Sequence, residues 1–303
     1  MIRKKIEKRR LDMSGDITVK DGSMYGGWRK PVNIWMDLPG SIHNDDVAEK
    51  IGMRGGTIPG TIHLNLFPPL LLKAFGQRWF EKGSISMYYT YATMHHEETR
   101  AVIGTSEEGA NDAQVEAWVE MKDGKRVATG SVSVGDVKEP SYLQSQELKD
   151  AESDELKILA GLKAGDKLPS NDVLIEQDEP DKVLDTITDP LDWYQSDSPW
   201  GGPILYPAAM YHALMLTPKF PENKKLEAVG FFGATEIRII DGPIKVGVPY
   251  VAKGELICVG ASPKTEYFWY DSYLEEKESG NRIAEMRKLT RFMKASSPLY
   301  QRG

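Results

Sequence analysis

One short segment of the sequence combines a titratable side chain with backbone groups that can bind a carbonyl oxygen. It begins with the polar loop Asp37-Leu-Pro-Gly-Ser-Ile-His43. An imidazole changes charge near neutral pH, so His43 can take or give a proton under physiological conditions. Asp37 can orient that imidazole or exchange a proton with an activated water, although it is equally suited to forming the turn at Pro39 and Gly40. The loop is therefore a candidate site for acid–base chemistry on a carbonyl compound.

The element that follows the loop must position the rest of such a site. From Thr61 to Phe75 the sequence is apolar on nearly all sides and has no carboxylate, which predicts a helix buried against a sheet. Pro68 and Pro69 predict a kink or a break within it. Gly60 comes directly before the helix, so unpaired backbone N–H groups at Gly60 and Thr61 are expected to face a ligand carbonyl.

After residue 83 the sequence changes to β-branched and aromatic residues in partial alternation, which predicts strands. The segment Lys122-Asp-Gly-Lys125 has the Asp-Gly centre of a hairpin turn. The predicted strands cover 85–91, 99–103, 113–121 and 126–134, and later 228–240, 250–259, 265–275 and 282–292.

Two features of the first half recur in the second half in the same order. A glycine pair precedes an apolar helix without carboxylates at 61–75 and again at 207–216. The hairpin segment Gly124-Lys-Arg-Val-Ala recurs as Gly280-Asn-Arg-Ile-Ala. The spacing is 68 residues from Gly56 to Gly124 and 78 residues from Gly202 to Gly280. This order and spacing predict an internal duplication.

The halves are separated by a charged stretch with little β-strand character. We therefore expect an N-terminal domain over 1–140 that carries the histidine loop, a linker over 141–182 and a C-terminal domain over 183–303. Each domain consists of one helix followed by a run of antiparallel strands. Because helices do not alternate with strands, the predicted fold class is α+β.

This order of elements resembles the hotdog fold, and the loop resembles that of the MaoC-like acyl-CoA dehydratases and R-specific enoyl-CoA hydratases. The matching segment is Ser41-Ile-His43-Asn-Asp45-Asp-Val-Ala-Glu-Lys-Ile-Gly-Met-Arg-Gly-Gly-Thr-Ile-Pro-Gly60. The resemblance implies a double hotdog with two long central helices, each wrapped by an antiparallel β-sheet. The second half has Gln195-Ser-Asp197-Ser-Pro-Trp200 in place of a histidine loop, and so resembles a degenerate half that keeps the fold.

The loop also departs from the family pattern, which is Asp, any residue, Asn, Pro, an aliphatic residue and His. A Gly-Ser pair replaces the Asn-Pro pair, and Asp37 stands six positions before His43, where the family has five. Either the loop carries one extra residue, or Asp45 or Asp46 is the acidic partner instead of Asp37.

The resemblance implies a hydro-lyase that adds or removes water at an acyl-CoA thioester. His43 would carry the proton transfers, and the backbone N–H groups at Gly60 and Thr61 would bind the thioester oxygen. No metal or other cofactor is implied, since coenzyme A enters as part of the substrate. One alternative is a hotdog thioesterase, but many of these place a carboxylate on the long helix, and neither predicted helix has one. The other alternative is a non-catalytic acyl-CoA-binding protein.

The remaining histidines and the single cysteine favour structural roles. His63 and His212 lie on the two apolar helices, where we expect hydrogen-bonded core residues. The run His95-His96-Glu97-Glu98 contains metal-binding residue types, but adjacent strand residues point to opposite faces and chelate poorly. We expect a solvated edge or turn there and no metal. Cys258 lies in an apolar run and is expected to be a buried, inert thiol.

Composition limits the partners of this 303-residue chain. Its net charge of −7 argues against nucleic acid, and its longest apolar run, 64–72, is short and contains two prolines, which argues against a membrane span. The basic start, residues 1–10, lacks a following apolar segment, so we expect a frayed or helical arm and no secretory signal. A cytoplasmic protein is the resulting expectation. Assembly of double hotdogs into a homo-oligomer remains open.

Overall fold

The architecture comes from a computed structural model, which describes residues 16–107, 110–176, 181–220 and 226–301. The basic arm predicted over residues 1–10 lies outside these ranges. Among the described residues, no helix has the length and apolar character needed to cross a bilayer.

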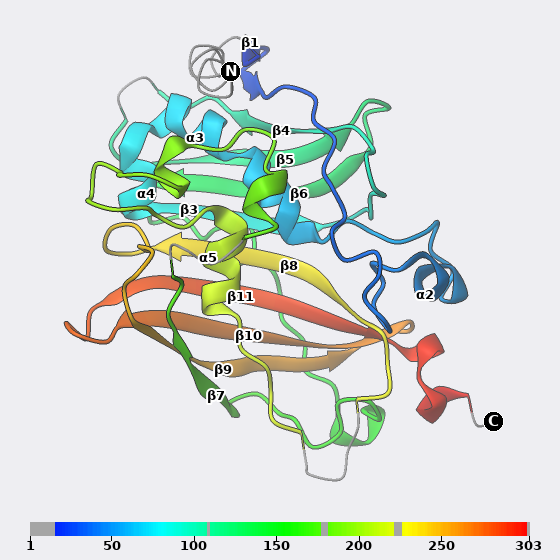
Figure 1. Cartoon of the computed structure of the whole chain (residues 1–303). Coiled ribbons are helices and arrows are strands. Elements are labelled where there is room, and N and C mark those ends of the chain that lie inside the picture. The colour runs from blue at the N-terminus through cyan, green and yellow to red at the C-terminus, as the bar shows by residue number, and fades with distance from the viewer. Residues whose placement is uncertain (1–15, 108–109, 177–180, 221–225, 302–303) are drawn as a thin grey trace.

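An antiparallel sheet of eleven strands forms the body of the protein (Figure 1). Its first part contains β1 (Thr18–Lys20), β2 (Ser23–Tyr25), β3 (Gly83–Tyr89), β4 (Thr99–Gly104), β5 (Ala113–Met121) and β6 (Arg126–Val134). Its second part contains β7 (Lys167–Val173), β8 (Gly230–Ile239), β9 (Tyr250–Ala261), β10 (Thr265–Glu276) and β11 (Arg282–Met293). All eight predicted strands are confirmed, with small differences at their ends.

The strand order repeats on the two sides of a central junction. The full order is β1-β2-β4-β5-β6-β3-β8-β11-β10-β9-β7, and β3 pairs with β8 at the junction. Counted outward from that junction, the order is β3-β6-β5-β4-β2 on one side and β8-β11-β10-β9-β7 on the other. Five strands of the first half, β2 to β6, therefore have counterparts at the same places in the second half, and β1 is an additional strand at the outer edge. This shared order supports the predicted internal duplication.

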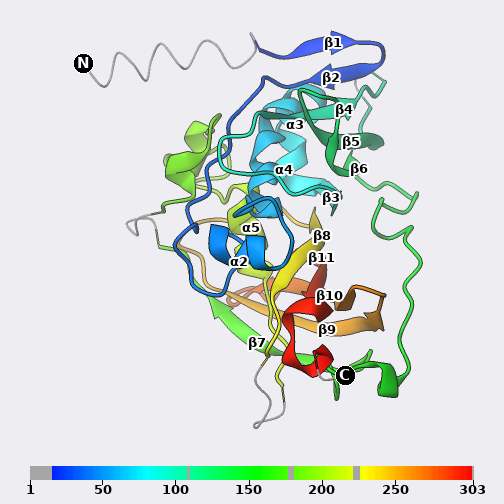
Figure 2. The same ribbon diagram turned by 90° about the vertical axis from the view of Figure 1, so that its right-hand side faces the viewer.

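The helical segments lie mainly on one face of the sheet, as the two views agree (Figures 1 and 2). The α-helices are α2 (Asp45–Lys50), α3 (Pro68–Phe75), α4 (Trp79–Lys82) and α5 (Pro207–Leu214). The 3-10 helices are η1 (Gly60–Leu66), η2 (Gly76–Arg78), η3 (Ser153–Glu155), η4 (Leu184–Thr186), η5 (Asp192–Tyr194), η6 (Lys294–Ser296) and η7 (Pro298–Tyr300).

Two long central helices were predicted, and the structure does not confirm them. The first predicted helix divides into the 3-10 helix η1 and the short α-helix α3. Proline has no N–H and its ring clashes with the preceding turn, so an α-helix cannot run through Pro68 and a new one begins there. The second helix, α5, has only 8 residues. Asn65 joins the two, because its Oδ1 accepts a hydrogen bond from Ala208 N at 3.0 Å.

The other face of the sheet is partly covered by the chain that connects the halves (Figure 2). Leu143 is fully buried there in a small cluster with Ala234, Cys258, Trp269 and Leu289. The buried Cys258 agrees with the expectation of a structural thiol, and burial raises its pKa to about 12.

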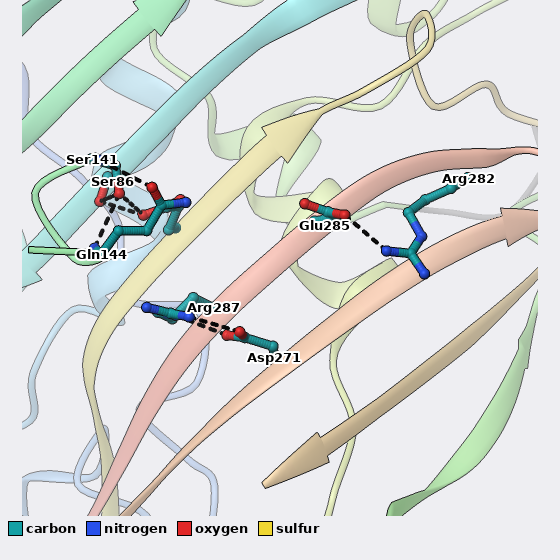
Figure 3. Close-up of polar contacts among 8 residues, drawn as sticks. Ser86, Ser141, Gln144, Asp271, Arg282, Glu285 and Arg287 are labelled. Atoms are coloured by element: carbon teal, nitrogen blue, oxygen red, sulfur yellow. Dashed lines mark hydrogen bonds and ion pairs between the residues drawn. The ribbon is translucent and has the colours of Figure 1, made fainter. Parts of the chain in front are cut away.

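Buried polar groups fix this connecting chain in place (Figure 3). The Glu236 carboxylate accepts hydrogen bonds from Ser86 Oγ at 2.8 Å, from Gln144 Nε2 at 3.1 Å and from the Ser141 hydroxyl. Leu143 N donates to Ser86 Oγ at 3.0 Å. The chain that connects the halves is therefore held to the sheet by an apolar cluster around Leu143 and by a network of hydrogen bonds around Glu236.

The predicted linker over 141–182 contains a strand that was not expected. β7 (Lys167–Val173) pairs with β9 and is the outer edge strand of the second half. Most of its residues are charged or polar and exposed, which explains why the sequence shows no β pattern there.

Replacing Leu143 by alanine is expected to lower the free energy of unfolding by about 2–4 kcal/mol, because the change removes a fully buried side chain and leaves a cavity. Chemical denaturation of the two proteins measures this. Leu174→Ala is the matched control, since Leu174 is 51% exposed and its truncation should change stability by less than about 0.5 kcal/mol. Equal effects of the two substitutions would contradict the proposed packing role of Leu143.

Candidate active site

The imidazole of His43 is held in one orientation by the backbone. Its Nδ1 lies 2.7 Å from the carbonyl oxygen of Thr57. Since a carbonyl oxygen only accepts, Nδ1 must carry the proton and donate it. The other ring nitrogen, Nε2, is then unprotonated in the neutral ring and has no hydrogen bond to any described residue. His43 therefore presents a free base.

The loop around His43 is fixed by further backbone contacts. The buried amide of Asn33 donates from Nδ2 to the His43 carbonyl at 2.8 Å and accepts from Trp35 N at 3.0 Å. Thr57 N donates to Ile42 O at 3.0 Å, so the segments on both sides of α2 pair beside the histidine. The position of the His43 ring is therefore fixed both by hydrogen bonds of the surrounding backbone and by the hydrogen bond of its Nδ1.

His43 opens onto a cavity of about 150 Å³. The cavity lies between the loop, the start of η1, and strands from both halves of the sheet. No Asp or Glu is among its described lining residues. These are Ile42, His43, Met53, Thr57, Ile58, Pro59, Gly60, His63, Tyr89, Tyr91, Ala92, Thr93, Val127, Gly230, Phe231 and Phe232.

The amino end of η1 supplies hydrogen-bond donors to the same cavity. Gly60 lines it, and the first backbone hydrogen bond of η1 runs from Ile62 N to Pro59 O at 2.9 Å. The N–H groups of Gly60 and Thr61 therefore have no backbone partner among the described residues. Gly60 is also the only residue type that fits, because a Cβ there would lie 2.8 Å from the Tyr89 ring. Glycine at position 60 therefore leaves room for the Tyr89 ring beside the start of η1.

The electrostatic setting keeps His43 uncharged. Burial lowers the pKa of His43 below its ordinary value, and the hydrogen bond to Thr57 offsets only part of this effect. Trp35 lies against the ring with centroids 6.1 Å apart and adds to its desolvation. At neutral pH the ring is therefore in the form that can accept a proton.

The three predicted acidic partners lie elsewhere. Asp37 is exposed, does not line the cavity and makes no hydrogen bond to His43 among the described residues. Asp45 starts α2, and its Oδ1 accepts from Gly56 N at 2.6 Å. Asp46 is exposed in the first turn of α2. The structure thus brings His43 and Gly60 to one cavity, whereas Thr61 is not among its described lining residues, and the position of the imidazole partner is taken by the Thr57 carbonyl.

The other histidines differ in their placement. His63 is buried, as predicted, and its Nε2 lies 2.9 Å from Thr93 Oγ1, but it also lines the His43 cavity. For His212 the prediction of a core residue is wrong, because it is exposed on α5 and lines a different cavity. His95 and His96 stack in a turn with ring centroids 3.7 Å apart. Among the described residues, no three metal-ligating side chains are grouped for a metal ion.

Two of the larger cavities outside this site are lined by titratable side chains. One, of about 760 Å³, is lined by Trp35 on one side and by Asp181, Tyr206 and His212 of the second half. The Tyr206 hydroxyl donates to Asp181 at 2.6 Å.

The other cavity, of about 550 Å³, lies on the outer face of the second half. Its charges neutralise one another in pairs, such as Arg287 with Asp271 at 2.8 Å and Arg282 with Glu285 at 3.0 Å (Figure 3). These paired groups, unlike His43, are not free to act as an acid or a base.

Several site residues were missed by the sequence analysis. Thr57 contacts the imidazole through its backbone carbonyl, which every residue has. Asn33 binds the backbone of His43, ten residues further along the chain, and its residue type does not indicate this contact. Tyr89 lies on a predicted strand, where an aromatic residue by itself indicates packing and not a site. His63 had a usable signal, because it stands three residues after Gly60 on the same helical segment.

Comparison with known proteins defines the fold. A scan against protein-family models found no match, and neither did a search of curated proteins. Among solved structures, a protein from Chloroflexus aurantiacus described as a MaoC domain dehydratase has a TM-score of 0.57 at 11% identity, covering 89% of this chain and 93% of that one. A conserved Mycobacterium tuberculosis protein with a double hotdog fold has a TM-score of 0.52 at 10% identity, covering 85% and 90%.

A third solved structure, a MaoC-like dehydratase, has a TM-score of 0.50 at 12% identity and covers 91% of this chain and 97% of that one. At such low identity, the likeness concerns the fold. This chain is a double hotdog, as the sequence predicted.

Stability should depend on pH through His63. Burial lowers its pKa to about 4, whereas the unfolded chain keeps an ordinary value of about 6.5. Between these values the unfolded state binds the extra proton, so stability present at neutral pH is lost as the pH falls. We expect the His63 contribution to fall by about 2 kcal/mol between pH 7 and pH 5. Urea unfolding of the protein and of His63→Leu at both pH values measures it, and parallel losses would contradict it.

Proposed function

We propose that this protein is a hydro-lyase of the enoyl-CoA hydratase or 3-hydroxyacyl-CoA dehydratase type, acting on an acyl thioester. One observation carries the proposal. His43, whose Nε2 is free, and Gly60, whose N–H is unpaired, both line a single small, mostly apolar cavity. A base and an oxyanion donor at one apolar cavity suit an unsaturated acyl chain that is joined to a polar thioester.

The proton transfers can be written with His43 alone. In the hydration direction, Nε2 takes a proton from water while the hydroxide oxygen bonds to Cβ of the enoyl group. The electron pair of the double bond moves toward the thioester oxygen, giving an enolate. The imidazolium then returns the proton to Cα, which restores the thioester and the neutral ring. Dehydration is the reverse, and no other acid is required to balance the step.

The developing negative charge on the thioester oxygen needs a donor that is already in place. The N–H groups of Gly60 and Thr61 stand at the start of η1, where the backbone dipoles point their positive ends outward. Their hydrogen bonds would strengthen as the enolate forms, which lowers the barrier. Thr57 has the supporting role, since its carbonyl stabilises the imidazolium through Nδ1.

The proposal needs no metal or redox cofactor, and coenzyme A is part of the substrate. A hotdog thioesterase is the alternative activity, and a non-catalytic acyl-CoA-binding protein is the alternative without one. The absence of carboxylates from η1, α3 and α5 continues to favour the hydro-lyase over thioesterases that use a helix carboxylate. Crotonyl-CoA separates the three: loss of the enoyl absorbance without free thiol supports hydration, thiol release means hydrolysis, and bound but unchanged substrate means a binding protein.

Replacing His43 by asparagine is expected to lower kcat for hydration of crotonyl-CoA by at least about 100-fold. Asparagine retains a donor that can reach the Thr57 carbonyl but has no group that titrates. The enoyl absorbance measures the rate, and circular dichroism checks folding. His96→Asn is the matched control, because His96 is exposed and lies outside the cavity. Near-normal turnover by a folded His43→Asn protein would contradict the assignment.

Replacing Gly60 by alanine is expected to reduce kcat by about 10-fold or more. The new methyl group would meet the Tyr89 ring at 2.8 Å, so the start of η1 or the ring must shift and the N–H groups move with it. Gly104→Ala is the control, since a Cβ there makes only an ordinary contact of 3.4 Å with Val115. Comparable kinetics of the two variants would mean that the end of η1 does not hold the thioester.

A further inference from the structure

Two buried polar atoms lack partners at the His43 cavity. His63 Nδ1 and the Tyr89 hydroxyl have no hydrogen bond to any described residue, and both side chains line that cavity. The Thr235 hydroxyl lies close enough to the Tyr89 hydroxyl to lower its pKa somewhat, although the two do not meet in ordinary hydrogen-bond geometry, so both keep capacity for a further partner. Buried polar groups in folded proteins are nearly always satisfied, so unpaired ones at a cavity wall indicate a polar guest.

The geometry of η1 places His63 at a defined distance from Gly60. In a 3-10 helix, side chains three residues apart eclipse one another, so His63 lies on the same side of η1 as Gly60. Three residues advance the helix by about 6 Å, at about 2 Å each. A chain whose thioester oxygen is bound at Gly60 would therefore reach His63 about four or five carbon atoms further on.

The polar groups at this depth are uncharged. Burial lowers the pKa of His63 to about 4 and raises the pKa of Tyr89 above its ordinary range, so both are neutral at pH 7. No Asp, Glu, Lys or Arg is among the described residues that line the cavity. The buried Lys288 does not line the cavity, and its Nζ lies over the ring of Phe232, a lining residue, 4.0 Å from the ring centroid. An anionic guest would therefore lack a countercharge.

We propose that the preferred acyl group is short and carries an uncharged oxygen, a hydroxyl or a carbonyl, near its distal end, where His63 Nδ1 and the Tyr89 hydroxyl bind it. This inference rests on the proposed function, because it takes the thioester end to lie at Gly60. The tautomer of His63 is free to change, since Thr93 Oγ1 can accept from Nε2 or donate to it. The pair can therefore match a hydroxyl, which donates to one group and accepts from the other.

The cavity volume limits the length of the acyl group. About 150 Å³ accommodates a chain of roughly four to six heavy atoms beyond the thioester and not a fatty acyl chain. Both halves of the protein set this limit, because Tyr89 comes from β3 and Phe232 from β8, which pair directly.

The test compares 5-hydroxypent-2-enoyl-CoA with pent-2-enoyl-CoA. We expect kcat/KM to favour the hydroxylated substrate by at least about 10-fold, because the analogue without oxygen leaves two buried groups unpaired. His63→Leu and Tyr89→Phe should each reduce this preference several-fold or more. Tyr91→Phe is the matched control, since Tyr91 also lines the cavity but its hydroxyl is not among the unpartnered ones. An equal preference in all variants would overturn the proposal, because water would then satisfy the two atoms.

Binding of unreactive saturated thioesters separates this inference from the proposed function. By calorimetry, 5-hydroxypentanoyl-CoA should bind at least about 10-fold more tightly than pentanoyl-CoA and than glutaryl-CoA, whose distal group is anionic. This preference without turnover of any enoyl-CoA would support the ligand class and contradict the hydro-lyase. Turnover without this preference would support the hydro-lyase and contradict the ligand class. Tightest binding of glutaryl-CoA would overturn the assignment of an uncharged group.

Discussion

The hydrogen bond between His43 Nδ1 and the Thr57 carbonyl is the interaction on which the site depends. It sets the tautomer of the ring, leaves Nε2 free and joins the histidine loop to the segment that leads into η1. The same two segments are joined by Thr57 N with Ile42 O and by Asp45 with Gly56 N. A Cβ at Gly56 would lie 2.3 Å from the His43 carbonyl, so the close approach requires glycine. His43 and the start of η1 are thus held by one small, cross-linked turn.

The duplicated fold provides the walls for this turn. Pairing of β3 with β8 brings Tyr89 of the first half beside Phe231 and Phe232 of the second half, and all three line the cavity. The second half has no histidine at the corresponding loop, yet it closes the site of the first half. Its contribution to the cavity is shape, through the side chains of β8.

The helix type matters for what the cavity contains. Prolines at 68 and 69 end the first helical segment early, and the residues before them form a 3-10 helix. The tighter turn aligns His63 with Gly60, so a residue that looked like core packing also faces the ligand space. The apolar surroundings then keep it neutral, which is the same physical effect that keeps His43 a base.

Sequence alone determined the parts of this protein that depend on local pattern. Alternating β-branched and aromatic residues marked eight strands, two Gly-containing hairpins indicated the duplication, and the loop with its glycines led to the prediction of His43 and Gly60 as site residues. Tertiary structure decided what depends on contacts between distant residues. It gave the imidazole a backbone carbonyl in place of a carboxylate, left His63 and Tyr89 unpaired, placed His212 in the open and added β7 to the second half. Every residue has a backbone carbonyl, so the sequence does not show which one binds the imidazole. A polar edge strand lacks the alternation of apolar residues that identifies other strands, so β7 could not be recognised from the sequence.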